Sequence, residues 1–327
     1  MKIKRIAYGV LLACTAASWS VAAVAEEYPS KPIRLLLGFS AGGSTDTVAR
    51  FYAAKLSEVL KTSVVVVNRP GASQLVAVRS IMAAEPDGYT IFMASGSAMS
   101  QGPGVRTDLP YDPLKDFTLI ALAATAPGVI VTTASLPIKT IGELATYSKA
   151  NPDKINYGSS GLGSASNLQT EYLKSLSGIK MTHIPFKADA EIMSAIASGS
   201  VQVGLSPVQG ALPSIQNGHI RALAVTGSKR VSVLPDVPAL SEVEIPGLGA
   251  VDPYTYYAVV GPKGMSAEAV KKLNDAINEV SQMPETIAYM GDRAYEPVVS
   301  TPESLQEYVA TDLAKWKSFS GQVVLKN

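Results

Sequence analysis

Three clusters of small polar residues in this chain can bind an anion without activating it. They are Gly42-Gly43-Ser44-Thr45-Asp46, Ser95-Gly96-Ser97 and the stretch from Ser159 to Asn167. Glycine lets backbone N–H groups approach a ligand closely, and hydroxyl groups add further donors. Asp46 is the exception, because a carboxylate repels an anion. We interpret Asp46 as a cap for the N–H groups of its own loop, or as the partner of a donor on the ligand.

Each cluster follows a predicted β-strand, namely Leu35–Leu37, Thr90–Ala94 and Ile155–Gly158. Helical patterns begin at Ser44 after the first cluster and at Leu168 after the third. The first N–H groups of a helix have no partner inside the helix, and the helix dipole adds positive potential there. Such a helix start after a glycine turn favours carboxylate binding. An ordinary βα turn of small residues is the alternative, and the repetition of the motif in both halves favours the binding interpretation.

Strands and helices alternate along the chain, which is typical of an α/β protein with doubly wound parallel sheets. Ligands bind beyond the carboxyl ends of such strands, so we expect the clusters to face one cleft. The pattern predicts two doubly wound domains with a cleft between them, in which residues 26–127 and 251–327 form domain 1 and residues 128–250 form domain 2. Further predicted helices cover 74–84, 140–150, 189–197, 208–215, 266–280 and 301–319, and further strands cover 64–67, 117–122, 129–133, 201–205, 221–226 and 257–260. Residues 102–116 are predicted to be a loop punctuated by proline and glycine.

Catalytic constellations are scarce in this sequence. The two histidines, His183 and His219, have no recognisable partner. G-x-S-x-G, G-x-x-x-x-G-K-[ST] and H-E-x-x-H motifs are all missing, and the third glycine of a dinucleotide fingerprint does not follow Gly163. We therefore expect no catalytic residues, no metal site and no cofactor. Tyr254 and its neighbours form either the aromatic wall of a pocket or part of a core.

The first 25 residues have the order of a secretory signal peptide. A basic start is followed by the short apolar region Ile6–Ala17 and by Ala23-Val24-Ala25, an A-x-A site for cleavage before Glu26. Cys14, the only cysteine, follows Leu11-Leu12-Ala13, so lipidation of Cys14 is the alternative. Cleavage after Ala25 would leave a mature chain without cysteine, which excludes disulfides and thiol chemistry.

The composition limits the classes of function that remain. The chain has 327 residues, 47% of them hydrophobic, so it can bury the cores of two domains. Its formal net charge of +1 gives no electrostatic footprint for nucleic acid. No stretch after the signal peptide is long and apolar enough to span a bilayer.

Several motifs, in order along the mature chain, resemble the substrate-binding receptors of tripartite tricarboxylate transporters, also called Bug receptors. The motifs are Tyr28-Pro29-Ser30-Lys31-Pro32-Ile33-Arg34, Gly42-Gly43-Ser44-Thr45-Asp46, Val67-Asn68-Arg69-Pro70-Gly71-Ala72, Pro86-Asp87-Gly88-Tyr89-Thr90, Leu109-Pro110-Tyr111-Asp112-Pro113, Ile155-Asn156-Tyr157-Gly158, His183-Ile184-Pro185-Phe186-Lys187, Arg221-Ala222-Leu223-Ala224-Val225-Thr226 and Leu234-Pro235-Asp236-Val237-Pro238. The resemblance implies a periplasmic binding protein type II-like fold. It also implies a monomeric periplasmic receptor that closes on a small carboxylate and passes it to two membrane subunits.

The resemblance also assigns roles to the clusters. The first loop would hold one ligand carboxylate, partly through ordered waters, and the loop after Gly158 would hold the far end of the ligand. The predicted ligand-binding residues are Phe39, Ser40, Ala41, Gly42, Gly43, Ser44, Thr45, Asp46, Ser95, Ser97, Ser159, Ser160, Gly161, Ser164, Ser166, Asn167, Phe186, Ser206 and Tyr254.

Departures from the family pattern leave the ligand open. Relatives usually have two prolines at Ser40-Ala41, often a histidine at Asn167, and Phe-Asp-Asn where this chain has Leu205-Ser206-Pro207. Two other functions remain as alternatives, a ligand-binding module for a two-component sensor and an exported enzyme. Neighbouring genes would separate transport from sensing, and turnover of a bound carboxylate would reveal an enzyme.

Overall fold

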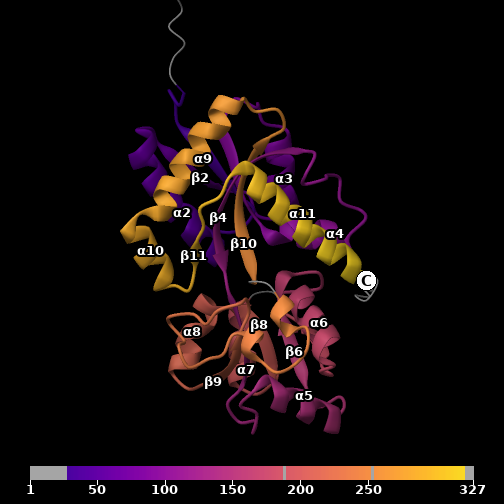
Figure 1. Cartoon of the computed structure of the whole chain (residues 1–327). Coiled ribbons are helices and arrows are strands. Elements are labelled where there is room, and N and C mark those ends of the chain that lie inside the picture. The colour runs from indigo at the N-terminus through magenta and orange to yellow at the C-terminus, as the bar shows by residue number, and fades with distance from the viewer. Residues whose placement is uncertain (1–27, 187–188, 252–253, 321–327) are drawn as a thin grey trace, which may run out of the picture.

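Two β-sheets form the centre of the molecule, one above the other in Figure 1. The computed structural model describes residues 28–186, 189–251 and 254–320. Within these residues the first sheet has the strand order β11-β4-β10-β3-β1-β2, and the second has the order β7-β6-β8-β5-β9. The predicted signal peptide, including Cys14, lies outside the described residues.

The strands and helices follow the predicted alternation closely. The strands are β1 (Ile33–Leu37), β2 (Val64–Asn68), β3 (Thr90–Ser95), β4 (Phe117–Ala126), β5 (Gly128–Thr133), β6 (Asn156–Ser159), β7 (Thr182–Pro185), β8 (Val203–Pro207), β9 (Ile220–Val225), β10 (Thr255–Pro262) and β11 (Glu296–Pro297). The helices are α2 (Ser44–Leu60), α3 (Leu75–Met82), α4 (Gly102–Val105), α5 (Ile141–Ala150), α6 (Ala165–Ser177), α7 (Asp189–Ala197), α8 (Val208–Gln216), α9 (Ala267–Gln282), α10 (Pro284–Gly291) and α11 (Pro302–Phe319), with a π-helical turn, η1 (Ser97–Gln101), and short 3-10 turns at Leu240–Glu242 and Leu248–Ala250.

The first sheet is covered by helices on both faces. Successive side chains of a strand point to opposite faces, so Leu35 and Leu37 pack with α2 and α9, whereas Leu36 packs with α3 and α11. This explains why Leu35–Leu37 of β1 form a continuous apolar run rather than an alternating one. The second sheet repeats the arrangement, with α5 and α6 on one face and α7 and α8 on the other.

The prediction of purely parallel sheets is wrong for the strands that connect the two sheets. β1, β2 and β3 are parallel, but β10 is antiparallel to both β3 and β4. The reason is the route of the chain. β4 ends at Ala126 and β5 starts the second sheet at Gly128, so β4 runs toward the second sheet and β10 runs back from it. The carboxyl ends of β1 to β4 consequently face the second sheet.

Residues 102–116 differ from the predicted loop at their start, where Gly102–Val105 forms the helix α4. Pro103 is tolerated because it lies in the first turn of that helix. A Cβ atom on Gly104 would lie 2.3 Å from Cβ of Trp316, so this glycine allows α11 to pack closely against α4. Within the part of the chain that the structure describes, no helix combines the length and hydropathy needed to cross a membrane.

Candidate functional site

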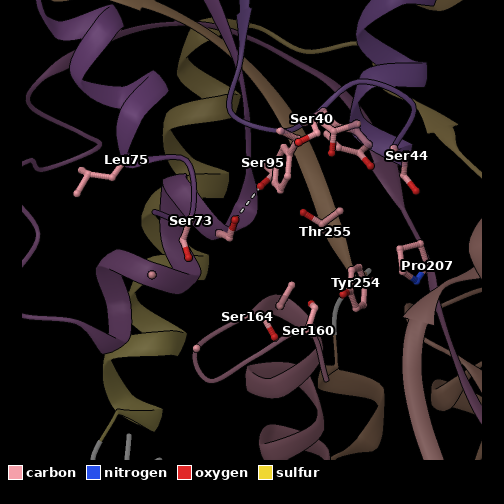
Figure 2. A pocket seen from close by; sticks show the side chains of 18 of the residues that line it. Ser40, Ser44, Ser73, Leu75, Ser95, Ser160, Ser164, Pro207, Tyr254 and Thr255 are labelled. Atoms are coloured by element: carbon pink, nitrogen blue, oxygen red, sulfur yellow. Dashed lines mark hydrogen bonds between the residues drawn. The ribbon is translucent and has the colours of Figure 1, made fainter. Parts of the chain in front are cut away.

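Loops from both sheets line one cavity of about 600 Å³ (Figure 2). The first sheet contributes the loops after β1, β2 and β3 and the start of β10, and the second contributes the loop after β6 and the end of β8. The lining residues are Phe39, Ser40, Ala41, Gly43, Ser44, Thr45, Ser73, Leu75, Ser95, Ser97, Gly102, Arg106, Leu109, Tyr111, Ser160, Leu162, Gly163, Ser164, Ala165, Pro207, Tyr254, Thr255 and Tyr257.

The loop after β1 presents the amino terminus of α2 to the cavity. Gly42 has a φ of +89°, in the left-handed region that glycine enters without steric cost. Gly43 is the N-cap of α2 and supplies no side-chain acceptor for the first N–H groups of the helix. The start of α2 thus combines positive potential with donors that no side-chain cap occupies.

Asp46 stabilises this loop from behind the cavity wall. Its carboxylate accepts hydrogen bonds from the Gly42 N–H at 2.9 Å, from Arg50 Nε at 2.8 Å and from Asn68 Nδ2 at 2.9 Å. Burial raises the pKa of Asp46, but the hydrogen bonds from Arg50, Gly42 and Asn68 outweigh burial and lower that pKa below its ordinary value. Asp46 is 3% exposed and does not line the cavity. Of the two interpretations of Asp46, the geometry matches the cap.

The loop after β6 repeats this arrangement with an amide in place of the carboxylate. Asn167 Oδ1 accepts from the Gly163 N–H at 3.0 Å, four residues earlier, as Asp46 accepts from Gly42. Ser164 is the N-cap of α6, and its hydroxyl accepts from the Asn167 N–H at 3.3 Å. The start of α6 therefore has a side-chain cap, whereas the start of α2 has none.

The structure brings eleven of the nineteen predicted ligand-binding residues to the cavity surface. These are Phe39, Ser40, Ala41, Gly43, Ser44, Thr45, Ser95, Ser97, Ser160, Ser164 and Tyr254. The others do not line the cavity and are Gly42, Asp46, Ser159, Gly161, Ser166, Asn167, Phe186 and Ser206.

Two of the residues that do not line the cavity have clear structural roles. Ser206 is 1% exposed, and its hydroxyl donates to the carbonyl of Pro207 at 3.1 Å, so Pro207 rather than Ser206 faces the cavity. Phe186 is half-buried and packs against the hydrophobic cluster of β5, α7 and α8.

His183 has a partner that the sequence did not reveal. Its Nε2 atom lies 2.6 Å from Oγ of Ser159, and its ring stacks on Tyr157 with centroids 5.0 Å apart. Burial lowers the pKa of His183, which favours the neutral ring. Ser159 is fully buried and its Oγ also lies 3.1 Å from the Gly161 carbonyl, so the pair supports the loop rather than reaching the cavity. Among the residues that the structure describes, no group of three His, Cys, Asp or Glu side chains is placed to hold a metal ion.

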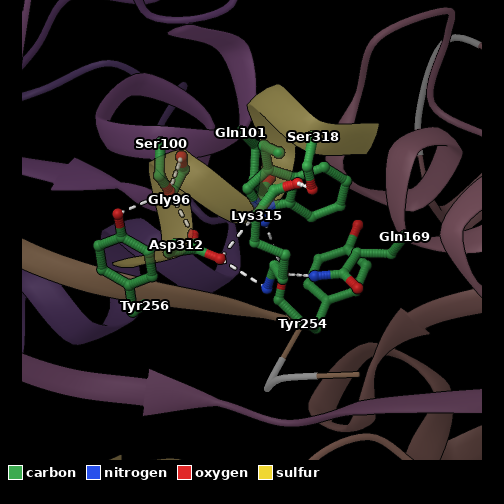
Figure 3. A network of polar contacts seen from close by, with 10 residues as sticks. Gly96, Ser100, Gln101, Gln169, Tyr254, Tyr256, Asp312, Lys315 and Ser318 are labelled. Atoms are coloured by element: carbon green, nitrogen blue, oxygen red, sulfur yellow. Dashed lines mark hydrogen bonds and ion pairs between the residues drawn. The ribbon is translucent and has the colours of Figure 1, made fainter. Parts of the chain in front are cut away.

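Tyr254 is both part of a core and part of the cavity wall. Its carbonyl accepts hydrogen bonds from Gln101 at 3.3 Å and from Gln169 at 3.5 Å, one from each half of the molecule (Figure 3). Tyr256 belongs to the core alone, where its hydroxyl pairs with Ser100 at 2.7 Å. Burial, and secondarily the Asp312 carboxylate, raises the pKa of Tyr256 well above its ordinary value.

Sequence reasoning missed the apolar part of the cavity wall. Leu75, Leu109, Tyr111 and Leu162 give this wall an apolar surface, and Arg106 is the one cation among the lining residues. The guanidinium of Arg106 pairs with Asp108 through Nε at 3.0 Å and Nη2 at 2.7 Å, and its side chain is 35% exposed. The rule that ligands bind at strand carboxyl ends would have pointed to the loop after β2. No pattern singled out the arginine.

Comparison with known proteins gives a consistent result. Residues 48–324 match the family described as "Tripartite tricarboxylate transporter family receptor". A curated protein of Cupriavidus necator, described as a UPF0065 protein in the gbd 5' region, is 34% identical over 301 residues, which are 90% of this chain and 88% of that protein.

Solved structures of similar proteins superpose over most of the chain. An R. palustris protein with adipate has a TM-score of 0.81 at 30% identity and covers 90% of this chain and 98% of its own. The periplasmic binding protein BugD has a TM-score of 0.77 at 30% identity with the same coverage. MatC from Rhodopseudomonas palustris with bound malate has a TM-score of 0.77 at 26% identity and covers 90% of this chain and 100% of its own.

Proposed function

This chain belongs to the tripartite tricarboxylate transporter receptor family, and from that premise we propose that it captures a plain small carboxylate, mono- or dicarboxylic, in the cavity between its sheets. As a member of this family it is a solute-binding receptor and not an enzyme. One observation carries the ligand proposal. The cavity combines the uncapped start of α2, serine hydroxyls from both halves and one guanidinium, and no lining side chain is a carboxylate.

The start of α2 is the proposed site of one ligand carboxylate. Backbone N–H groups at a helix start bind anions because they are unpaired and lie at the positive end of the dipole. Ser40 adds a hydroxyl donor from the same loop, and Ser95 at the end of β3 adds another (Figure 2). Ser97 in η1 lines the cavity beside Ser95. In this proposal Ser160 and Ser164 bind the distal end of the ligand from the second sheet. Asp46 and Asn167, which are buried behind the cavity wall, act by holding the two loops.

The shape of the cavity extends the proposal to the body of the ligand. Leu75, Leu109 and Leu162 supply apolar surface, and a cavity of about 600 Å³ is in the ordinary range for small-molecule sites. A methylene chain or a flat ring between acidic ends would bury its carbon atoms there. Adipate and malate, found in two similar structures, are the natural first probes of this class.

We propose further that the ligand closes two domains on each other. Domain 1 would comprise 26–127 and 251–327, and domain 2 would comprise 128–250, with hinges near Pro127 and Ala250, where the chain crosses between the sheets. Two crossing segments allow hinge closure around a bound ligand. The closed monomer would then deliver its ligand to two membrane subunits of the transporter.

Export to the periplasm is part of the same proposal. The mature chain is expected to begin at Glu26 and to carry no lipid, because Ala23-Val24-Ala25 fits a cleavage site. Intact mass measurement of the protein purified from the periplasm tests this. A lipid on Cys14 would contradict it.

A thermal-shift screen of succinate, malate, adipate, benzoate and citrate tests the ligand class. A ligand at 100 times its Kd stabilises the folded protein by about 2.7 kcal/mol, which raises the melting temperature by a measurable amount. Arg106→Met is the informative variant, because losing hydrogen bonds to a charged group costs about 1.5–3 kcal/mol. We expect Arg106→Met to lower the affinity for the dicarboxylate that binds most tightly by about tenfold or more. Arg79→Met, on the exposed side of α3, should leave that affinity unchanged. Absence of any shift across the panel would overturn the proposed function.

A further inference from the structure

Gln74 lies directly behind the cavity wall in an unusual backbone turn. Ala72, Ser73 and Gln74 have φ values of 46°, 52° and 73°, three successive non-glycine residues in the left-handed region. Such conformations are disfavoured for residues with a Cβ atom and persist only where the surrounding structure holds them. Here the turn directs the Gln74 side chain under Gly38, where a Cβ atom on Gly38 would lie 2.5 Å from Cγ of Gln74. Gln74 is 1% exposed.

The side-chain amide of Gln74 uses all its donors on the serine pair of the cavity. Nε2 lies 2.7 Å from Oγ of Ser95 and 2.6 Å from Oγ of Ser97. Oε1 accepts from the backbone N–H of Ser95 at 3.3 Å. This last bond fixes the orientation of the amide, because an amide nitrogen in that position would face another donor.

The direction of these bonds determines where the serine protons point. An amide nitrogen donates and does not accept, so neither hydroxyl can donate to Nε2 of Gln74. The two serine oxygens lie 2.9 Å apart, and one hydroxyl proton can occupy the bond between them. The remaining proton has no acceptor in this cluster and is available on the cavity side, since both serines line the cavity.

We propose that Gln74 is a positioning residue that fixes the Ser95–Ser97 pair as a hydrogen-bond donor toward the ligand. It thereby selects an acceptor, a carboxylate oxygen, over an N–H group at this end of the cavity. This inference rests on the proposed function, and it adds a residue that never touches the ligand. The proposed role of Gln74 does not depend on the glycine loop or on Arg106.

Gln74→Glu should reverse the direction in which the Ser95 and Ser97 hydroxyl protons point, while keeping the size of the side chain at position 74. A glutamate carboxylate only accepts, so both hydroxyl protons would turn toward residue 74 and leave lone pairs facing the ligand. The probes are the dicarboxylate among succinate, malate and adipate that binds the wild type most tightly, and the monoamide of that acid. Calorimetry gives the ratio of their affinities. We expect Gln74→Glu to lower the preference for the diacid over the monoamide at least tenfold.

Two controls separate this effect from charge and from misfolding. Gln101→Glu places a carboxylate on another buried glutamine, whose amide bonds the Tyr254 carbonyl rather than a serine, so it measures the effect of charge alone. The preference should change at least fivefold less in Gln101→Glu than in Gln74→Glu. In a Ser95→Ala/Ser97→Ala background, Gln74→Glu should change the ratio of diacid to monoamide affinity no more than Gln101→Glu changes it in the wild type. The reason is that both serine hydroxyls are absent from this background.

The possible results are distinguishable. An unchanged ratio in folded Gln74→Glu, or a change no larger than that in Gln101→Glu, overturns the role of Gln74 and leaves the proposed function standing. If Gln74→Glu does not fold, the neutral variant Gln74→Met must lower the ratio in the wild type and leave it unchanged in the double-serine variant. If the wild type binds none of the three acids, the proposed function fails, and this inference fails with it.

Discussion

The hydroxyl of Ser44 donates a hydrogen bond of 2.9 Å to the side-chain oxygen of Gln209, which joins a helix of the first sheet to a helix of the second. Ser44 is the first residue of α2 and Gln209 lies in the first turn of α8. The hydroxyl of Tyr295 lies 3.3 Å from the same Gln209 oxygen. Because Ser44 also lines the proposed anion site, this contact connects ligand binding with the approach of the two halves.

Gln209→Ala should favour the open arrangement and weaken ligand binding. A net contribution of about 0.5–1.5 kcal/mol for a hydrogen bond corresponds to a loss of affinity of roughly two- to tenfold. Calorimetry measures the affinity, and small-angle scattering should show a larger radius of gyration at subsaturating ligand than for the wild type. Gln216→Ala, at the exposed end of the same helix, should behave as wild type. Unchanged affinity and scattering would show that the contact does not contribute to closure.

Gly43→Val should abolish carboxylate binding without unfolding the protein. A Cβ atom on Gly43 would meet only the Ser40 carbonyl oxygen, 4.0 Å away, and the backbone φ of −81° is ordinary for valine. The side chain would instead occupy the space that the ligand needs at the start of α2. Thermal unfolding verifies folding and calorimetry verifies binding. Gly291→Val, at a position with no atom within 4 Å, is the control. Affinity within a few-fold of wild type would move the anion site away from this loop.

Plain acids should bind at least tenfold more tightly than amino acids of similar size. A buried ammonium group needs an acceptor, preferably a carboxylate, to compensate for its desolvation. No lining side chain is acidic, and the Ser206 hydroxyl is turned away from the cavity. Calorimetry with succinate and benzoate against aspartate and glutamate makes the comparison. Tight binding of glutamate together with no binding of either plain acid would refute the prediction.

Asp46→Asn should destabilise the protein by about 2 kcal/mol at pH 7. An amide has one oxygen, so it can accept either from Gly42 and Arg50 or from Asn68, and its NH2 group would then face the remaining donor. The folded-state pKa of Asp46 lies below the ordinary value of 3.8. Its stabilising contribution is therefore present above pH 3.8 and is lost as the pH falls through the lower folded value.

Urea unfolding of both proteins between pH 7 and pH 3 measures this difference in stability. The difference should shrink as the pH falls below about 4. Asp275→Asn, whose exposed carboxylate pairs with Lys271 on α9, should show almost no difference at any pH. A difference between Asp46→Asn and wild type that stays constant with pH would mean that the charge of Asp46 is not what stabilises the loop.

The sequence by itself determined the order of the elements and the two loops that face the cavity. Leu35–Leu37 is apolar at every position because helices cover both faces of β1 there. This apolar run predicts a buried strand even when the covering helices are unknown. The helix starts at Thr140 and Thr301 were predictable because a hydroxyl caps the backbone three residues ahead, which is a local interaction. The glycine and serine clusters could be recognised because their residues are adjacent in the sequence.

Only the tertiary structure decided which side chains reach the cavity. Asp46 and Asn167 were predicted at the ligand because of their position in a loop, but burial and hydrogen bonds to Gly42 and Gly163 place them behind the wall. Gln74 and Arg106 carry no local pattern, since their roles depend on Ser95 and on a cavity formed by distant segments. The antiparallel course of β10 likewise follows from the return of the chain from the second sheet, which no local sequence signal encodes.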